Sequence, residues 1–158
     1  MSVLVLMAKT IGGAKSMTDA QYREVVLFLV DDDDVDYMAV ERAMRQMRLL
    51  NPLVRARDGR AALEMLNGGA VQGAFVILLD LNMPRMNGLE FLQALRADPQ
   101  FASAVVFVLT TSRADEDKLA AYSFNVAGYV VKSNIKDEFE RIINMLDGYW
   151  RIVELPKL

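Results

Sequence analysis

The chain contains no cysteine and no histidine, and these two absences exclude most kinds of active site. Without cysteine it has no disulfides, no thiolate metal ligands and no thiol nucleophile. Without histidine it lacks the commonest general base, the commonest zinc ligand and the usual partner of a nucleophilic serine. Most hydrolases and metalloenzymes are thereby excluded, and the remaining chemistry is that of carboxylates, hydroxyls and amines.

Basic blocks and long apolar runs are also missing. The 158 residues include 18 basic and 21 acidic side chains, a net charge of −3. Because nucleic-acid backbones are bound through a concentrated positive field, we expect no direct nucleic-acid binding. No run approaches the ~18 apolar residues of a membrane-spanning helix. The apolar start Met1 to Met7 lacks the preceding basic residue of a secretory signal, so we expect a cytoplasmic protein that does not bind membranes.

The first 16 residues differ from the rest because they contain Lys9 and Lys15 but no acidic residue. The run from Gly12 to Ser16 is typical of a linker, or of sequence upstream of a natural start at Met17. An edge strand from Ser2 to Leu6 is the less favoured alternative. The expected organisation is an N-terminal extension at 1–24, one domain at 25–148 and a C-terminal tail at 149–158.

Short apolar runs alternate with stretches of helical periodicity from Val25 onward. The runs that indicate strands are Val25 to Val30, Leu53 to Arg57, Phe75 to Leu79, Val105 to Leu109 and Gly128 to Val131. The first, third and fourth runs are continuous rather than alternating, which is typical of strands covered on both faces. These three runs therefore predict central parallel strands.

Helical spacing of apolar residues follows each strand candidate. An apolar stripe of Val35, Ala39, Ala43, Met47 and Leu50, with Asp34 as N-cap, predicts a helix from Asp34 to Met47. Leu63 and Leu66 mark a second helix that ends at Asn67-Gly68-Gly69, and Leu89, Leu92 and Leu95 mark a third that ends before Asp98-Pro99. The fourth predicted helix runs from about Asp115 to Phe124 around Leu119 and Tyr122. The fifth contains Phe139, Ile142, Ile143, Leu146 and Trp150. This alternation predicts an α/β fold, a doubly wound five-stranded parallel sheet with helices on both faces.

Four of the predicted strands end in an unusual polar residue. Asp31 and Asp32 follow the first strand, Asp80 the third, Thr110 the fourth and Lys132 the fifth. In open α/β sheets, ligands bind outside the carboxyl ends of the strands, where the strand order reverses. We therefore expect three acids, one hydroxyl and one amine to meet in one crevice.

Three neighbouring carboxylates raise one another's pKa values or require a counter-cation. A set of oxygen ligands suits a hard divalent ion, and Mg²⁺ is typical where phosphate oxygens complete the ligand shell. Lys132 would add a positive charge and Thr110 a hydroxyl donor. The covalent chemistry that remains is attack by a carboxylate on a phosphoryl donor. Asp80 is the favoured nucleophile because it stands alone, whereas the adjacent pair Asp31 and Asp32 suits metal binding.

These residues and their neighbours resemble the response-regulator receiver family. The matching motifs are Phe28-Leu29-Val30-Asp31-Asp32, Leu79-Asp80-Leu81-Asn82-Met83-Pro84-Arg85-Met86-Asn87-Gly88, Leu109-Thr110-Thr111 and Gly128-Tyr129-Val130-Val131-Lys132. They occur in order within about Val25 to Gly148. The resemblance implies a flavodoxin-like sheet with strand order 2-1-3-4-5.

The resemblance also implies a role for each acidic residue. Asp80 would be the phosphoacceptor, Asp32 a direct Mg²⁺ ligand and Asp31 a ligand through water. Asn82 would add its backbone carbonyl to the metal.

Thr110 and Lys132 would bind phosphoryl oxygens, and Tyr129 would be a rotating aromatic side chain that responds to phosphorylation, with Thr110 also part of the switch. One departure concerns the residue after Lys132, where the family usually has a cis proline and this chain has Ser133. Either the Lys132–Ser133 peptide is trans and the loop is shifted, or surrounding contacts hold a strained cis bond.

By this resemblance the chain is a single-domain response regulator of a two-component phosphorelay and not an enzyme. A sensor histidine kinase would phosphorylate it, and the signal would leave through protein–protein interaction, because no residues remain for a DNA-binding domain. The segment Tyr149 to Pro156 and the long first helix are similar to stand-alone receivers paired with phytochrome-type histidine kinases. The output would be contact with a kinase, a target protein or a second copy, so a homodimer is one possibility.

Two alternatives stay open. A small phosphatase with an aspartyl nucleophile is disfavoured because such enzymes need a second acid two residues after the nucleophile, and this position holds Asn82. The second alternative is a binding module that has the same fold but is not phosphorylated. Each polar residue alone could be a helix cap or a turn residue. Caps and turns do not explain why such residues follow four separate strands.

Overall fold

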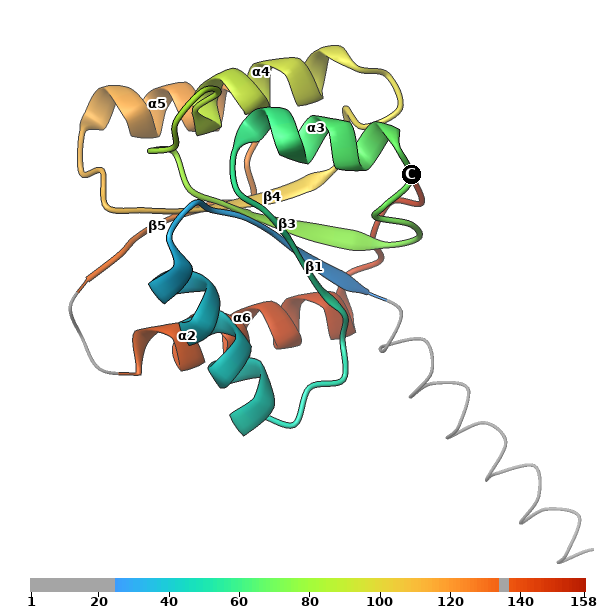
Figure 1. Ribbon diagram of the computed structural model, residues 1–158, viewed down its shortest axis with the longest axis vertical. Helices are drawn as coiled ribbons and strands as arrows, with labels where there is room; N and C mark the ends of the chain where they lie inside the picture. Colours follow the sequence, from blue (N-terminus) through green and yellow to red (C-terminus); the bar gives the residue numbers. More distant parts are fainter. Residues whose placement is uncertain (1–24, 134–136) are drawn as a thin grey trace, which may run out of the picture.

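The computed structural model describes residues 25–133 and 137–158, which form a parallel sheet between two layers of helices (Figure 1). The elements in chain order are β1 (Val26–Val30), α2 (Asp34–Gln46), β2 (Leu53–Ala56), α3 (Gly59–Asn67), β3 (Phe75–Leu79), α4 (Gly88–Ala97), β4 (Val105–Thr110), α5 (Asp115–Ser123), β5 (Gly128–Val131) and α6 (Glu138–Ile152).

The five strands are parallel and lie in the order β2-β1-β3-β4-β5. This confirms the predicted doubly wound, flavodoxin-like fold. Each strand begins and ends within one residue of its predicted bounds. One of these small differences concerns a predicted site residue, because Thr110 is the last residue of β4 rather than the residue after it.

Side chains of the central strands alternate between two hydrophobic clusters, one on each face of the sheet. Phe28, Ile77 and Val108 face the layer of α3, α4 and α5. Leu29 and Leu78 face the layer of α2 and α6. Because β1 and β3 are buried along their whole length, the continuous apolar runs are explained by helices on both faces.

The predicted apolar stripe of α2 is partly wrong, because Ala43 and Met47 lie on the inner face as predicted but Val35 and Leu50 do not. Val35 is 73% exposed and Leu50 is 65% exposed, whereas the buried face carries Val40, Ala43 and Met44. The helix does begin at Asp34, but its N-cap is Asp33, whose side chain accepts a hydrogen bond from the Val35 backbone N–H at 2.8 Å.

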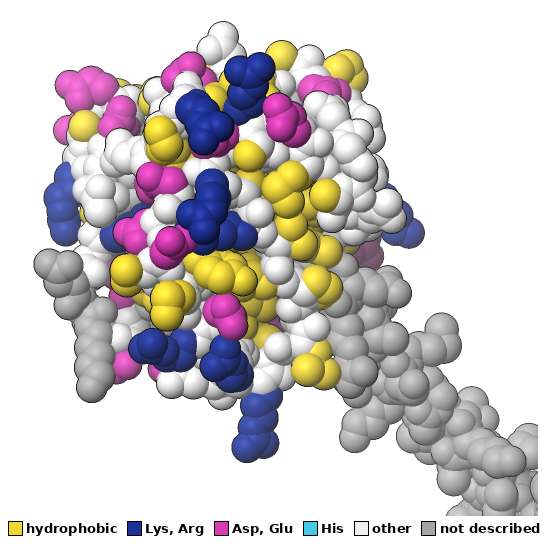
Figure 2. Space-filling model, in the orientation of Figure 1, with side chains coloured by type: hydrophobic (Ala, Val, Ile, Leu, Met, Phe, Trp, Pro, Cys, Tyr) yellow, Lys and Arg dark blue, Asp and Glu magenta, His cyan; other side chains and the backbone are white. Residues whose placement is uncertain are grey.

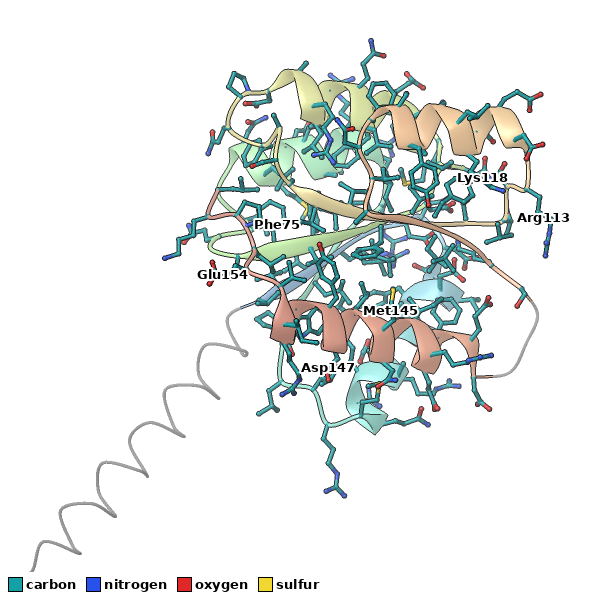
Figure 3. The ribbon with its side chains drawn as sticks, turned by 180° about the vertical axis from the view of Figure 1, so that it is seen from behind. Phe75, Arg113, Lys118, Met145, Asp147 and Glu154 are labelled. Carbon is teal, nitrogen blue, oxygen red and sulfur yellow. The ribbon has the colours of Figure 1, made fainter. Side chains whose placement is uncertain are left out.

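The last helix, α6, continues through position 149 to Ile152 and carries Trp150 into the core. The following residues pass along the edge of the sheet where the strands begin, because Leu155 packs against one hydrophobic cluster and Leu158 against the other. Figure 3 shows Glu154 near Phe75, the first residue of β3, while Lys118 of α5 and Arg113 just before this helix lie at the opposite end. The domain boundary at 149 stays a prediction.

In the described part of the chain, no helix is both long enough and apolar enough to span a membrane. Basic and acidic side chains are interspersed over the face shown in Figure 2. The predictions for the N-terminal extension, including the linker at Gly12 to Ser16, the start at Met17 and the strand Ser2 to Leu6, fall outside the described residues.

Gly88 begins α4 and determines how closely this helix approaches the residues after β3. A Cβ atom at this position would lie 2.5 Å from the Asp80 carbonyl oxygen and 2.7 Å from the Leu81 Cα. Because both atoms are backbone, we expect Gly88→Ala to lower the free energy of unfolding by about 1–3 kcal/mol, measured by urea denaturation.

Gly148 provides the matched control because a Cβ there meets nothing within 4 Å and the residue lies inside α6. We expect Gly148→Ala to raise the free energy of unfolding by about 0.5–1 kcal/mol. Equal effects of the two substitutions would show that the close approach at Gly88 is not the cause.

Candidate functional site

The register between β1 and β3 places Asp31 and Asp80 side by side. Val30 pairs with Leu79, so the residues that follow these two are neighbours at the carboxyl edge of the sheet. The Asp80 backbone N–H donates to the Val30 carbonyl at 2.9 Å, which continues the ladder one residue beyond the strands. The order of the sheet reverses between β1 and β3, so the predicted crevice is at the expected place.

Asp31, Asp32 and Asp80 form a cluster in which one carboxylate oxygen from each lies within 4.8 Å of the others. Asp31 and Asp80 are buried and Asp32 is exposed. Backbone N–H groups orient the two buried carboxylates, because Asp33 donates to Asp31 Oδ1 at 2.8 Å and Asn82 donates to Asp80 Oδ1 at 3.2 Å. Three oxygen donors of this kind fit a divalent cation such as Mg²⁺, with Asp32 on the solvent side.

Lys132 reaches the cluster from β5. Its backbone N–H donates to the Thr110 carbonyl at 2.7 Å, so its side chain starts beside the end of β4. The ammonium Nζ lies 3.3 Å from Asp31 Oδ2 and 3.4 Å from Asp80 Oδ2. The predicted convergence of acids and amine is therefore present in the structure.

Thr110 is fully buried at the end of β4, and its side chain is linked to the loop after β3. The Asn82 side-chain amide donates to Thr110 Oγ1 and to Thr111 Oγ1, both at 3.4 Å. No pattern in the sequence indicates this amide contact. The expected role of the Asn82 backbone carbonyl toward a metal stays a prediction.

Asp36 is a member of the site that the sequence analysis missed. It lies in the first turn of α2, is 8% exposed, and its Oδ2 accepts a short hydrogen bond from Lys132 Nζ. The signal available in the sequence was spacing alone, because Asp36 stands four residues before Val40 and seven before Ala43, which places it on an apolar face of the helix.

The loop after Lys132 has no cis peptide bond among the described residues, so the Lys132–Ser133 peptide is trans. Glu138, the first residue of α6, holds this loop through Ser133. Its carboxylate accepts hydrogen bonds from the Ser133 backbone N–H at 2.8 Å and from the Ser133 hydroxyl at 3.0 Å. A proline at this position could not donate the first of these bonds.

Tyr129 is half-buried in β5, next to the loop after β4. Its hydroxyl donates to the Ser112 carbonyl at 3.0 Å. Burial raises the pKa of Tyr129 above its usual value. The predicted switch residue is thus tied to the loop that begins at Thr110.

An open depression of about 460 Å³ lies beside the acidic cluster. It is lined by Asp32, Leu81, Asn82, Met83, Pro84, Asn87, Leu89 and Asp117. The two buried carboxylates are not among the lining residues, so the depression is the solvent side of the site rather than its centre.

Burial and charge shift the pKa values of Asp31 and Lys132 in the site. Burial raises the pKa of Asp31 to about 7, despite the Asp33 N–H and the Lys132 ammonium, which both lower it. For Lys132, burial opposes the charged form, but the hydrogen bond to Asp36 and the charges of Asp31 and Asp80 outweigh it. The pKa of Lys132 therefore lies above its usual value, and the amine is an ammonium at neutral pH.

The contribution of Asp31 to the stability of the metal-free protein should fall as the pH rises from about 4 to about 7. Asp31 ionises near 3.8 in the unfolded chain and near 7 in the folded protein, so within this window only the folded state holds the proton. We expect Asp31→Asn to flatten this dependence, measured by urea unfolding in a chelator at several pH values. An unchanged slope would contradict the raised pKa.

Asp34→Asn is the control for this experiment. Its hydrogen bond with Arg55 and the charge of Arg57 lower the pKa of Asp34, so its contribution to stability changes only at lower pH. We expect Asp34→Asn to leave the slope between pH 4 and 7 unchanged.

Several known proteins are similar to this chain. Response regulator Rcp1 of Synechocystis sp. is 33% identical over 149 residues, which cover 89% of this chain and 99% of that protein. The chemotaxis protein CheY of Pseudomonas aeruginosa is 29% identical over 126 residues, which cover 77% of this chain and 98% of that protein.

Solved structures of response regulators are also similar to this chain. The Mn²⁺-bound form of response regulator Rcp1 superposes with a TM-score of 0.74 at 30% identity, covering 83% of this chain and 98% of that one. The phosphorylated cyanobacterial phytochrome response regulator RcpA gives 0.76 at 28% identity, covering 84% and 98%. A family model for the response regulator receiver domain matches residues 27–144. The chain therefore belongs to the response regulator receiver family of two-component signalling.

Proposed function

We propose that the chain accepts a phosphoryl group on Asp80 from a histidine kinase in a Mg²⁺-dependent reaction. The observation that carries the proposal is the surroundings of the Asp80 carboxylate. Two further acids lie within 4.8 Å of it and the Lys132 ammonium lies 3.4 Å from its Oδ2. This combination provides a nucleophile, a cation site and a fixed positive charge in one place.

The reaction is the attack of an Asp80 carboxylate oxygen on the phosphorus of a phosphohistidine or of a small phosphodonor. A new P–O bond forms, the bond from phosphorus to the donor breaks, and the donor leaves with its bonding electron pair. Asp31, Asp32 and Asp80 would hold Mg²⁺, which neutralises charge on the transferring phosphoryl oxygens when bound.

Lys132 and Thr110 are the groups that would bind the phosphoryl oxygens. Lys132 supplies an ammonium, and Thr110 a buried hydroxyl. We infer that the loop beginning at Thr110 moves toward the phosphoryl group, and that Tyr129 follows because its hydroxyl is bonded to Ser112 of the same loop. The new charge thereby favours a second conformation of the face that includes α5.

A phytochrome-type histidine kinase is the partner that similarity supports best. The phosphorylated RcpA, which is described as a phytochrome response regulator, matches 84% of this chain. A bacteriophytochrome response regulator, RtBRR, matches the same share with a TM-score of 0.65 at 32% identity.

Incubation with Mg²⁺ and acetyl phosphate should add the mass of one phosphoryl group. We expect this shift to be absent in Asp80→Asn, because an amide is not a nucleophile for this reaction, and to persist in Asp98→Asn at the far end of α4. Intact-mass spectrometry is the measurement. Rapid multiple-turnover release of phosphate would indicate a phosphatase instead, and the absence of any adduct would indicate an inert binding module.

Mg²⁺ should raise the melting temperature because it binds the folded site alone. At a hundredfold excess over Kd the stabilisation is about 2.7 kcal/mol. We expect Asp32→Asn to remove most of the rise and Asp34→Asn, at the first residue of α2, to keep it. Differential scanning calorimetry tests this, and an equal rise in Asp32→Asn would exclude Asp32 from the metal site.

A further inference from the structure

The ammonium of Lys132 has three carboxylate partners, and one of them is not needed for metal binding. Asp31 and Asp80 belong to the acidic cluster, at 3.3 and 3.4 Å from Nζ. The third partner is Asp36 of α2, whose Oδ2 accepts a hydrogen bond from Nζ. Asp36 is not part of the cluster that could hold a cation.

The Asp36–Lys132 pair is largely shielded from water, because each side chain is only 12% exposed. Ion pairs in such places are stronger than surface pairs, since solvent screens them less. Asp36 also reaches the pair from a helix that packs against the sheet through Val40 and Ala43, so its position is fixed by the core.

The charge of the site changes when Asp80 is phosphorylated. A carboxylate carrying one negative charge becomes an acyl phosphate with a phosphoryl group of about two negative charges. The Lys132 ammonium, which cannot stay fully engaged with every anion, then has a stronger partner in a phosphoryl oxygen.

We propose that Asp36 is a positioning residue that holds the Lys132 ammonium toward α2 in the unphosphorylated protein and competes with the phosphoryl group for it. Phosphorylation would transfer the ammonium from the Asp36 carboxylate to a phosphoryl oxygen. This inference rests on the proposed function, because it requires Asp80 to be the phosphoacceptor.

The backbone beside Lys132 favours a movement of the side chain alone. Glu138 holds Ser133 through the backbone N–H at 2.8 Å and the hydroxyl at 3.0 Å. The Lys132 N–H is bonded to the Thr110 carbonyl at 2.7 Å. With both sides of the residue anchored, the ammonium changes partners by rotating the flexible four-carbon side chain.

The test measures phosphorylation rates with acetyl phosphate below saturation and Mg²⁺ in excess, followed by intact mass. Asp36→Asn keeps the shape of the side chain and removes its charge. We expect the phosphorylation rate to increase on the order of fivefold, because the ammonium no longer has to give up a charge-assisted hydrogen bond and part of that bond's free energy appears in the rate. A slower or unchanged rate would overturn the proposal.

Two controls distinguish the effect of the Asp36–Lys132 ion pair on the phosphorylation rate from a general effect of removing a negative charge. Asp34→Asn makes the same charge change on the same helix, but Asp34 is exposed and pairs with Arg55 and Arg57 instead. We expect it to leave the rate unchanged. In a Lys132→Met background, Asp36→Asn should also have no effect. An increase that persists without the lysine, or that Asp34→Asn reproduces, would overturn the proposal.

A measurement on the unmutated protein covers the case in which Asp36→Asn does not fold. With Mg²⁺ and beryllofluoride as phosphoryl mimic, the ¹³C resonance of the Asp36 carboxylate should shift while that of Asp34 stays. An unmoved Asp36 resonance would overturn the inference. Failure of the wild-type protein to form any phosphoryl adduct would instead overturn the proposed function itself.

Discussion

The attraction between one ammonium and several buried carboxylates is the interaction on which the site depends. Asp31, Asp36 and Asp80 each contact Lys132, so three negative charges meet a single positive charge. Such an imbalance is costly in a buried place. Burial raises the pKa of Asp31 to about 7, so near neutral pH a proton removes part of the excess charge. A divalent cation held by the clustered carboxylates of Asp31, Asp32 and Asp80 would neutralise the excess in the same way.

The parallel sheet determines which kind of side chain each strand can contribute. Neighbouring strands lie about 4.8 Å apart, so β5 is roughly 10 Å from β3. From that distance only a long side chain returns to Asp80, and Lys132 does so across 3.4 Å. Thr110 ends β4, which lies between β3 and β5, and its short side chain contacts Asn82 of the loop after β3. The sequence separation of 101 residues between Lys132 and Asp31 is thus bridged by strand order and side-chain length.

The sequence predicted the fold and the central acids because both depend on strand patterns. Continuous apolar runs mark strands buried on two faces, and their carboxyl ends are then bound to meet. The face of α2 was predicted only in part, because this helix has apolar residues on several sides and an acid, Asp36, occupies its inner face. Four consecutive aspartates also leave the choice between Asp33 and Asp34 as N-cap undecided by residue type. The contacts of Asn82 and Glu138 depend on loop conformation, which periodicity does not describe.

The site is connected to both helix layers, and the replacement of proline by Ser133 strengthens one of these connections. Ser133 keeps a backbone N–H, and Glu138 of α6 accepts its hydrogen bond. Asp36 ties the tip of Lys132 to α2, which packs with α6 on the same face of the sheet. On the other face, Thr110 and the Ser112–Tyr129 hydrogen bond lead to α5. Hydrogen bonds on the lysine side and on the threonine side therefore link the surroundings of Asp80 to both helix layers.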